Sequence, residues 1–390
     1  MPLIASLKLV CFVLPGLLLP VSYPPARAET PAPPESFDVL SREAQAARES
    51  GRVDEAVDLY RRALAVRGDW DEGWWYFGTL HYEAGRGKEA RQAFARFVEL
   101  KPDSGPGFTL LGLSTFLAGD HAAAIEEIQK GLELGVGGNA ELLRAGRHQL
   151  ALAFVKTGQF ERAVQPFTQL ARTSPEAPWL LDAIGLMVLR SAALPSEVPQ
   201  ERRELVRLAG RAGYLHLSLH AEEAGKAYDA LVAAHPNEPW VHYAHAVFLL
   251  RSDSERALAE LRRELEVKPD NVMAHLEIAF ELILRGENSA ARPFAERAAA
   301  LAPGLFAARN AKGRVLVELG ELETGILELE EAVRLAPESP EVHFALARAY
   351  SKAGRAEDAA RERDTFARLD RERREKRASQ AGPRTEAARP

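Results

Sequence analysis

The hydrophobic positions of the chain recur with the period of an amphipathic helix. Between about residues 37 and 370, large apolar residues return every three or four positions, and no stretch shows the strict alternation of a β-strand. Short breaks that contain Gly, Pro, Asn or Asp separate these apolar stretches. The pattern predicts an all-α protein made of many short helices.

A second, longer period lies over the first. A small residue returns in a similar context at steps of 34, 34, 39, 61, 33, 34, 34 and 34 residues. A large apolar residue usually follows four positions later, as at Phe94, and a Pro often follows twelve positions later, as at Pro102. This phase predicts a repeated unit of two helices. The small residues are Ala56, Ala90, Ala124, Ala163, Ala224, Ala257, Ala291, Gly325 and Ala359.

The clearest copy has the order of residues found in a known repeat family. Trp74, Phe77, Gly78, Ala90, Phe94 and Pro102 follow one another at the spacing W-x2-L-G…A-x3-F…P. The chain thus resembles the tetratricopeptide repeat family over about residues 37–370. The resemblance implies a right-handed α-solenoid of about nine helix-turn-helix repeats, whose first helices line a concave groove.

Two of the steps are irregular. The 39-residue step adds five residues near 135–139, which predicts either a Gly-rich loop or a first helix extended at its start. The 61-residue step holds one unpaired helix, from Trp179 to Ser191, then a link with Pro195 and Pro199, and a long helix from about Gln200 to Leu219. Two interpretations remain open: one continuous solenoid with an odd helix, or a bend near 192–200.

The N-terminus has the pattern of an export signal. Lys8 precedes the apolar run Leu9–Leu19, and Ala26-Arg27-Ala28 has the small-x-small pattern of a cleavage site. We expect residues 1–28 to be a signal peptide that is cleaved after Ala28, which leaves a periplasmic or secreted protein. The alternatives are an uncleaved anchor and a lipid-modified Cys11. Residues 29–36 are Pro-rich and predict a disordered leader.

The C-terminal end is highly charged. Asp364–Arg377 continues as a charged helix, and residues 371–390 predict the end of a capping helix followed by a disordered tail. The alternative is a tail that binds an anionic surface or a nucleic acid. Acidic residues are interleaved with the basic ones, and residues 371–390 contain no aromatic residue, which favours the solvated cap.

Composition removes several classes of function. The chain has 50 Lys and Arg against 56 Asp and Glu, a net charge of −6, so no nucleic acid partner is expected. Its one Cys lies in the predicted signal, so the mature protein would have no thiol for a disulfide, a metal site or a nucleophile.

The chain also shows no pattern of a catalytic or cofactor site. Nucleophile elbows, P-loops and dinucleotide-binding turns are missing from the sequence. His216 and His220 lie four residues apart and His242 and His245 lie three apart, a spacing that can bind zinc. No carboxylate stands at a matching helical position, so structural histidines are the preferred interpretation. We expect no enzyme activity, no cofactor and no metal.

The resemblance implies which residues line the groove. Family positions on the first helix carry over to Trp75, Thr79, Tyr82, Phe116, His148, Leu276, Phe280, Phe344 and Arg348. Family members that clamp a C-terminal carboxylate have Lys and Asn at such positions, so carboxylate clamping is not expected here. The competing interpretation is that some apolar groove positions, such as Leu113, Leu117 and Leu284, pack within the solenoid instead.

These observations predict a non-enzymatic interaction scaffold of the cell envelope. An apolar, partly aromatic groove suits an amphipathic helix or an extended peptide. Two alternatives remain: a glycan- or envelope-polymer-binding module in which Trp74, Trp75 and Tyr82 stack on sugars, and a structural solenoid that self-associates through its ends. The partner is expected to be a protein or peptide, with no stable membrane span after cleavage of the signal.

Overall fold

The computed structural model describes residues 36–380, and within this range every regular element is a helix. The predicted signal peptide, Cys11, the leader up to residue 35 and residues 381–390 lie outside the described part. The N-terminal half holds α1 Phe37–Glu49, α2 Val53–Val66, α3 Asp71–Glu83, α4 Gly87–Leu100, α5 Gly105–Leu117, α6 His121–Leu134, α7 Ala140–Lys156, α8 Phe160–Thr173 and α9 Pro178–Val188. The C-terminal half holds α10 Arg203–Leu217, α11 Ala221–Ala234, α12 Val241–Leu249, α13 Ser254–Val267, α14 Val272–Leu284, α15 Asn288–Leu301, α16 Phe306–Glu318, α17 Leu322–Leu335, α18 Pro340–Lys352 and α19 Ala356–Gln380.

The contacts divide the chain into two compact units, residues up to Gly73 and residues from Trp74 onward. In the first unit, α1 and α2 pack on each other through buried residues such as Leu40 and Tyr60. Trp70 stacks on the Tyr60 ring at 5.6 Å between centroids and meets the Phe37 ring edge-on at 5.1 Å. This aromatic contact closes the end of the first helix pair.

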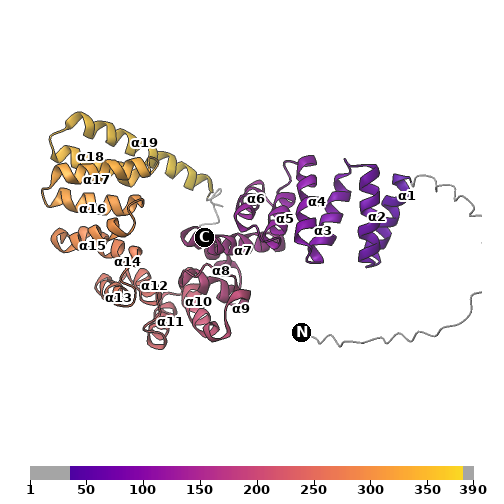
Figure 1. Cartoon of the computed structure of the whole chain (residues 1–390), viewed down its shortest axis with the longest axis horizontal. Coiled ribbons are helices and arrows are strands. Elements are labelled where there is room, and N and C mark those ends of the chain that lie inside the picture. The colour runs from indigo at the N-terminus through magenta and orange to yellow at the C-terminus, as the bar shows by residue number, and fades with distance from the viewer. Residues whose placement is uncertain (1–35, 381–390) are drawn as a thin grey trace, which may run out of the picture. The chain divides into compact units, whose positions relative to one another are not determined.

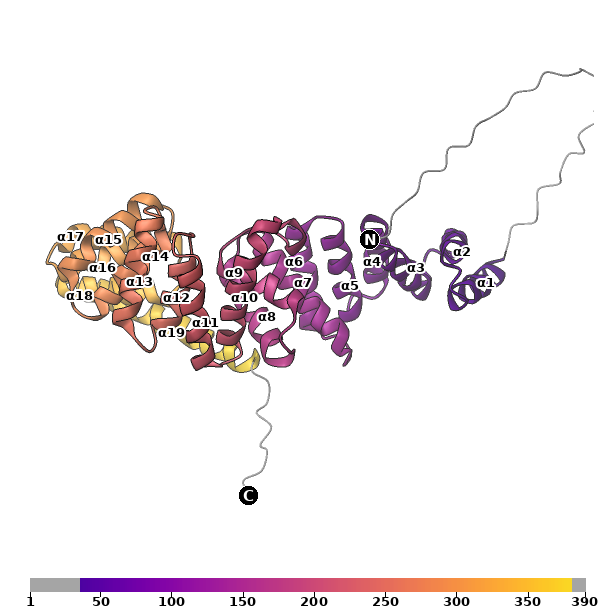
Figure 2. The ribbon, with the colours of Figure 1, turned by 90° about the horizontal axis from the view of Figure 1, so that it is seen from below.

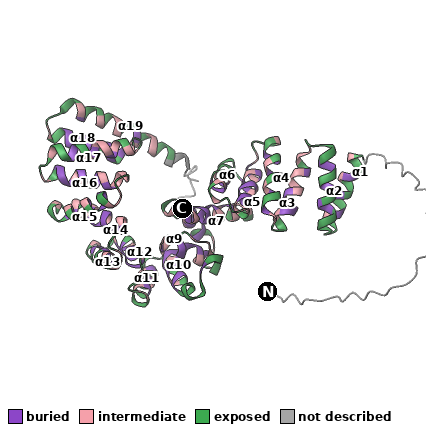
Figure 3. Ribbon diagram, viewed as in Figure 1, coloured by how far each residue is buried: buried purple, intermediate pink, exposed green. Residues whose placement is uncertain are grey.

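In the second unit, helices that follow one another in the chain lie side by side (Figures 1 and 2). α3 with α4, α5 with α6, α7 with α8, and the pairs from α12 to α19 each form a helix hairpin, and α9 is the extra helix beside the α10–α11 pair. Buried residues line the sides that face neighbouring helices, and exposed residues line the other sides (Figure 3). The all-α solenoid of helical repeats is confirmed.

Each hairpin depends on a close approach of its two helices. At Gly112 of α5, an added Cβ would lie 2.5 Å from a side-chain carbon of Ile128 on α6, which is closer than real Cβ atoms come. Gly313 of α16 meets Leu329 of α17 in the same way, at 2.6 Å. The small residue therefore provides the space that the large buried residue fills, which explains the spacing seen in the sequence.

The irregular 61-residue step folds as one more close helix pair. α9 packs against α10, and an added Cβ on Gly185 would lie 1.9 Å from the Val206 carbonyl oxygen. The link between them forms two short 3₁₀ turns, Pro195–Glu197 and Gln200–Arg202, and α10 begins at Arg203, later than expected. Lys156 of α7 anchors the link through an ion pair with Glu197 at 2.6 Å.

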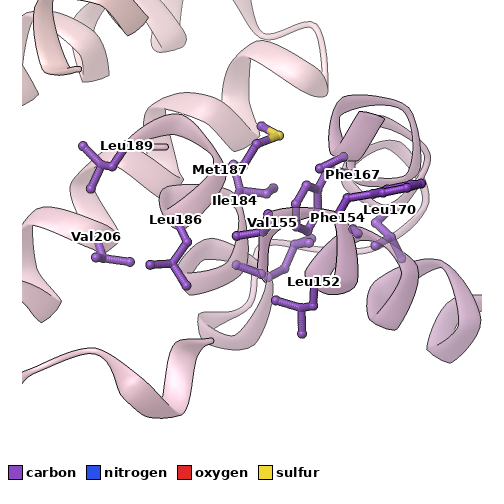
Figure 4. Packing of buried hydrophobic residues seen from close by; sticks show 14 of the residues in the cluster. Leu152, Phe154, Val155, Phe167, Leu170, Ile184, Leu186, Met187, Leu189 and Val206 are labelled. Atoms are coloured by element: carbon purple, nitrogen blue, oxygen red, sulfur yellow. The ribbon is translucent and has the colours of Figure 1, made fainter. Parts of the chain in front are cut away.

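One hydrophobic cluster runs through this region. Its residues extend from Leu113 to Val241 and include Leu189 before the link, Val198 within it and Val206 after it. Figure 4 shows side chains of α7, α8 and α9 meeting in this cluster, with Val206 of α10 beside Leu186. The link thus does not separate two cores.

The region of the five additional residues near 135–139 shows both predicted features, a Gly-rich loop and a first helix that is extended at its start. Gly135, Gly137 and Gly138 have positive φ angles, as a tight loop requires, and Val136 is buried. Asn139 then caps α7, because its side-chain oxygen accepts a hydrogen bond from the Leu142 backbone N–H. α7 has 17 residues, against 13 in α5, so the first helix is also extended at its start.

A basic side chain fastens each of the C-terminal repeats to the one before it. In α12, α14, α16 and α18 an equivalent His or Arg donates a hydrogen bond to the carbonyl of the Pro six residues earlier. The pairs are His242–Pro236, His275–Pro269, Arg309–Pro303 and His343–Pro337, at 2.9 to 3.0 Å. All but His275 also contact a Glu of the following helix. These contacts set the angle between successive hairpins.

The charged C-terminal helix is longer than expected. α19 runs to Gln380 and covers α18, with Phe366 against Phe344 at 5.4 Å and Ala359 and Leu369 buried. None of the described helices is both long and apolar enough to cross a membrane.

Most turns between the two helices of a hairpin contain a left-handed residue. Seven of these turns have Gly with a positive φ, from Gly51 to Gly354, but Leu219 stands at the same position with a φ of 67°. Its side chain is exposed and gains little from packing. A non-Gly residue in this conformation is strained by roughly 1–2 kcal/mol.

We therefore expect Leu219→Gly to raise the free energy of unfolding by about 0.5–1 kcal/mol, since Gly removes this strain. Gly320→Ala is the matched control. An added Cβ there meets nothing within 4 Å, so the substitution should cost about 1 kcal/mol through its φ of 87° alone. Urea denaturation followed by circular dichroism measures both. A loss of stability in Leu219→Gly would contradict the assignment of strain.

The His242 contact predicts a pH-dependent stability. Nδ1 of His242 lies 2.5 Å from a Glu260 oxygen and Nε2 faces the Pro236 carbonyl, so both nitrogens act as donors and the hydrogen bond to Glu260 raises the pKa of His242. Protonation is therefore favoured in the folded state. Its stabilising effect is complete below the unfolded pKa of about 6.5 and disappears as the pH rises through the folded pKa.

Glu260→Gln should accordingly lower the free energy of unfolding by roughly 1–2 kcal/mol at pH 6 and by clearly less at pH 9. Thermal unfolding at the two pH values measures the difference. Glu328→Gln is the control, because its partners Arg309 and Lys312 stay charged over this range. An equal loss at both pH values in Glu260→Gln would show that His242 is not protonated in the fold.

Candidate partner-binding site

Several of the predicted groove residues are partly covered by their own hairpins. The Trp75 ring meets Phe94 at 5.9 Å and Phe97 at 5.1 Å, and the Thr79 hydroxyl donates to the Trp75 carbonyl at 2.9 Å. Tyr82 is half-buried, and burial raises its pKa. These residues are therefore only partly accessible.

Two further predicted residues lie in the next hairpins. Phe116 of α5 contacts the His121 ring at 4.5 Å, and His148 of α7 meets the Trp179 ring at 4.7 Å. Burial lowers the pKa of His148 to about 4, so its imidazole is neutral at physiological pH. Both residues are half-buried.

The remaining four predicted residues divide between core and surface. Leu276 is only 4% exposed and belongs to the core, so its assignment to the groove was wrong. Its position on α14 turns toward the neighbouring helices, whereas Phe280 lies partly exposed on the same helix. Leu113 is also a core residue, but Leu117 and Leu284 are exposed.

Phe344 and Arg348 line one cleft of about 270 Å³, here called the α14–α18 cleft. Leu284 and Phe344, which are 76% and 48% exposed, form its apolar part. Glu318 accepts hydrogen bonds from Arg348 at 3.2 Å and Lys352 at 2.6 Å. Arg314 also lines the cleft and has no ion pair or hydrogen bond within the described residues; its guanidinium lies 5.9 Å from the Phe280 ring.

A second cavity, of about 310 Å³, lies where the repeat pattern is broken, and we call it the α8–α14 pocket. It is lined by residues of α8, the end of α9, α10, α11, α12 and α14. Most of its wall is apolar, and the polar groups are few: Glu161, Arg190, His216 and Glu277. A largely apolar pocket with a few charged groups is the usual form of a binding site. Apolar wall residues include Phe160, Val164, Met187, Val188, Val247 and Met273.

Arg190 fixes one side of this pocket. It follows α9 in a left-handed conformation, with a φ of 47°, and pairs with Glu161 at 2.6 Å. Its guanidinium lies 5.0 Å from the Trp240 ring, 5.3 Å from Tyr243 and 5.6 Å from Phe160. Three rings and one carboxylate therefore hold this cation in place.

Glu264 holds the backbone at the start of α12, where Trp240 and Tyr243 lie. Its carboxylate is fully buried and accepts hydrogen bonds from the backbone N–H groups of Trp240 and Tyr243 and from the Asn271 side chain, at 2.8 to 3.2 Å. Trp240 has a φ of 74°, which few non-Gly residues adopt. Glu264 thus caps α12 and holds Trp240 in this conformation.

Two further ionisable residues of the pocket, His216 and Glu277, are half-buried. Burial lowers the pKa of His216, whose ring meets Phe248 at 5.2 Å, so this imidazole is neutral. Burial raises the pKa of Glu277, and the Arg190 charge opposes that change. Burial also raises the pKa of Tyr243 to about 12. The pocket therefore combines an apolar wall with few, strongly placed charges.

The predicted histidine pairs do not form a metal site in the described part of the chain. His220 lies at the exposed start of α11, where its Nδ1 contacts Ser218, whereas His216 faces the α8–α14 pocket. Both nitrogens of His242 already contact Glu260 and Pro236. No group of three or more His, Cys, Asp or Glu among the described residues is placed to hold a metal ion.

Sequence reasoning missed the α8–α14 pocket. Its best signals were the 61-residue step and the aromatic residues around Trp240, but the pocket combines residues from six helices. Arg190 gave no signal because it lies outside the repeat positions.

The comparisons with known proteins agree with the repeat phase. A tetratricopeptide repeat model matches residues 41–105 and 77–137, and a second model of this repeat matches residues 313–354. The chain therefore contains tetratricopeptide repeats within these residues. Proteins of this kind generally serve as protein–protein interaction scaffolds and not as enzymes. The comparison with curated proteins finds no match.

The similarity to solved structures is low. MamA residues 41 to the end from Desulfovibrio magneticus RS-1 is 22% identical, covers 43% of this chain and 96% of its own, and has a TM-score of 0.40. Yeast Tom70 is 12% identical over 85% of each chain, with a TM-score of 0.34. The Cut9–Hcn1 hetero-tetramer of the APC/C is 15% identical over 85% of this chain and 66% of that one, with a TM-score of 0.36. Scores this low carry no information on function.

The packing of Arg190 predicts a stabilising role. Arg190→Gln removes the charge between three rings and leaves Glu161 without its partner, so the free energy of unfolding should fall by about 1–3 kcal/mol. Lys226→Gln is the control, because Lys226 and its partner Glu222 are both exposed and such pairs contribute less than about 1 kcal/mol. Urea denaturation compares them. Equal effects of the two substitutions would show that the aromatic setting of Arg190 adds nothing.

Proposed function

We propose that the chain is a non-enzymatic scaffold that holds a segment of a partner protein, an extended peptide or a helix, against its first helices. The observation that carries the proposal is the α8–α14 pocket, because its largely apolar wall remains open while Arg190 and Glu264 hold the residues beside it in place. Val247 lines the pocket and is 37% exposed, so its side chain is accessible to a partner.

One face of α14 joins this pocket to the α14–α18 cleft. Met273, Glu277, Phe280 and Leu284 follow one another at steps of four, three and four residues, which places them on one side of the helix. The first two line the α8–α14 pocket and Leu284 lines the α14–α18 cleft. A bound segment that follows this face would contact both sites.

The mechanism would be preorganisation. Glu264 caps α12, Lys156 anchors the link and Arg190 is held by three rings, so the wall loses little conformational entropy when a partner binds. Apolar and aromatic anchors in such a wall provide most of the binding free energy in typical interfaces.

The sugar-binding alternative has less support. A sugar stacks on an open aromatic face, and the Trp75 ring is partly covered by Phe94 and Phe97. Self-association through the ends of the solenoid remains an outcome of the experiment below. The proposed location is the periplasm or the exterior, on the basis of the N-terminal pattern with cleavage after Ala28.

Val247→Asp tests the proposal. Residues 29–390 serve as bait for crosslinked capture from the envelope fraction of the parent cell, and we expect the variant to lose the captured protein by at least about tenfold, since a carboxylate would be desolvated against the pocket wall. The melting temperature of the bait shows whether the fold is intact.

Leu327→Asp is the matched control, because Leu327 is an exposed apolar residue of α17 outside the two sites. It should retain the captured protein. Equal capture by Val247→Asp and the wild type would contradict binding at the α8–α14 pocket. Capture of the chain itself alone, with a mass that depends on concentration, would favour self-association.

A further inference from the structure

Glu277 is the exception among the carboxylates around the α8–α14 pocket. Glu161 pairs with Arg190, Glu281 pairs with Arg285 at 2.9 Å, and Glu264 is surrounded by N–H donors. Glu277 lines the pocket and has neither a hydrogen bond nor an ion pair within the described residues. Glu277 is half-buried, and a carboxyl group partly withdrawn from water without a partner is less stable than a paired one, so its place in the wall calls for an explanation.

The charges around the pocket leave an excess of negative charge. Its wall contains Glu161 and Glu277 as acids and Arg190 as a cation, while the His216 imidazole is neutral because burial lowers its pKa. Arg190 is committed to Glu161 and to three rings, and no other Lys or Arg lines the pocket. The Glu277 carboxylate is therefore left to pair with a positive charge on a bound partner.

The walls fit the rest of a long basic side chain. Met273 lies one helical turn before Glu277, and Met187 and Val247 complete an aliphatic wall, with the Tyr243 ring beside it. The stem of a Lys or Arg packs on such apolar groups while its charged end reaches a carboxylate. An aromatic ring beside the charge adds attraction.

The geometry points to a basic side chain, Lys or Arg, on the partner segment, with its charged end against Glu277 and its stem along Met273 and Val247. This inference rests on the proposed function and specifies the chemistry of the partner. The occupant is thus a protein segment in which a basic residue lies among apolar ones. Charge complementarity in a partly buried site gives specificity as well as affinity.

Peptide selection tests the inference without knowledge of the natural partner. A random twelve-residue peptide library displayed on phage is selected on the purified chain, and the enriched peptides should carry Lys or Arg next to apolar residues. A selected Lys is then replaced by norleucine, which keeps most of the stem and removes the charge. On the wild type, affinity should fall about ten- to a hundredfold, as expected for a charge-assisted hydrogen bond.

The same replacement should change affinity less than about threefold on Glu277→Gln, because the two substitutions remove the same interaction. Glu281→Gln is the matched control on the same helix, since that carboxylate is already paired with Arg285, and it should bind as the wild type does. Enriched peptides without basic residues, or an equal loss on the wild type and Glu277→Gln, would overturn the inference.

The outcomes also separate this inference from the proposed function. One outcome is that the selected peptides bind Val247→Asp more weakly than the wild type but bind Glu277→Gln equally well. That result would support the proposed function and contradict the inference that a basic side chain binds Glu277. If the chain selects no peptide, both fail. Thermal unfolding of each variant confirms that a loss of binding does not come from a loss of fold.

Discussion

The structure depends on the close contact between a small residue on one helix and a large residue on the next. Gly112 with Ile128 and Gly313 with Leu329 bring two helices together to a distance that a Cβ would prevent, and Gly78 with Phe94 leaves only a tight space for one. This contact uses one side of each first helix. Another side is less covered by its own hairpin, so Phe280 and Leu284 remain accessible, and Phe344 stays 48% exposed although it contacts Phe366 of α19.

The α8–α14 pocket exists because this packing is interrupted. α9 is joined to α10 by a long link instead of a short turn, so the end of α9 brings Arg190 to a place where a regular repeat would have no side chain. Glu264 and Lys156 then hold the irregular backbone. The departures from the repeat are thus stabilised by buried or paired groups, which is the usual situation where strain accompanies a functional site.

The repeat phase was readable from the sequence because it reflects local spacing: Ala90 and Phe94 lie one helical turn apart, and Pro102 ends the helix. The placement of Phe344 and Arg348 in one cleft followed the same phase. Leu276 was misassigned because a one-position rotation about the helix axis moves a side chain from surface to core. The α8–α14 pocket and the His242–Pro236 contact could not be predicted, since they join residues from different helices or depend on the angle between hairpins.

The central proposal is that a partner segment lies on the first helices around α12 and α14. A photo-crosslinking amino acid placed at position 247 in the producing cell tests it most directly, with position 327 on α17 as the comparison. The account predicts a crosslinked protein of defined mass at 247 and none at 327, and peptide mapping should place the adduct within an apolar segment. Crosslinks at 327 but not at 247, or none at either position, would contradict it.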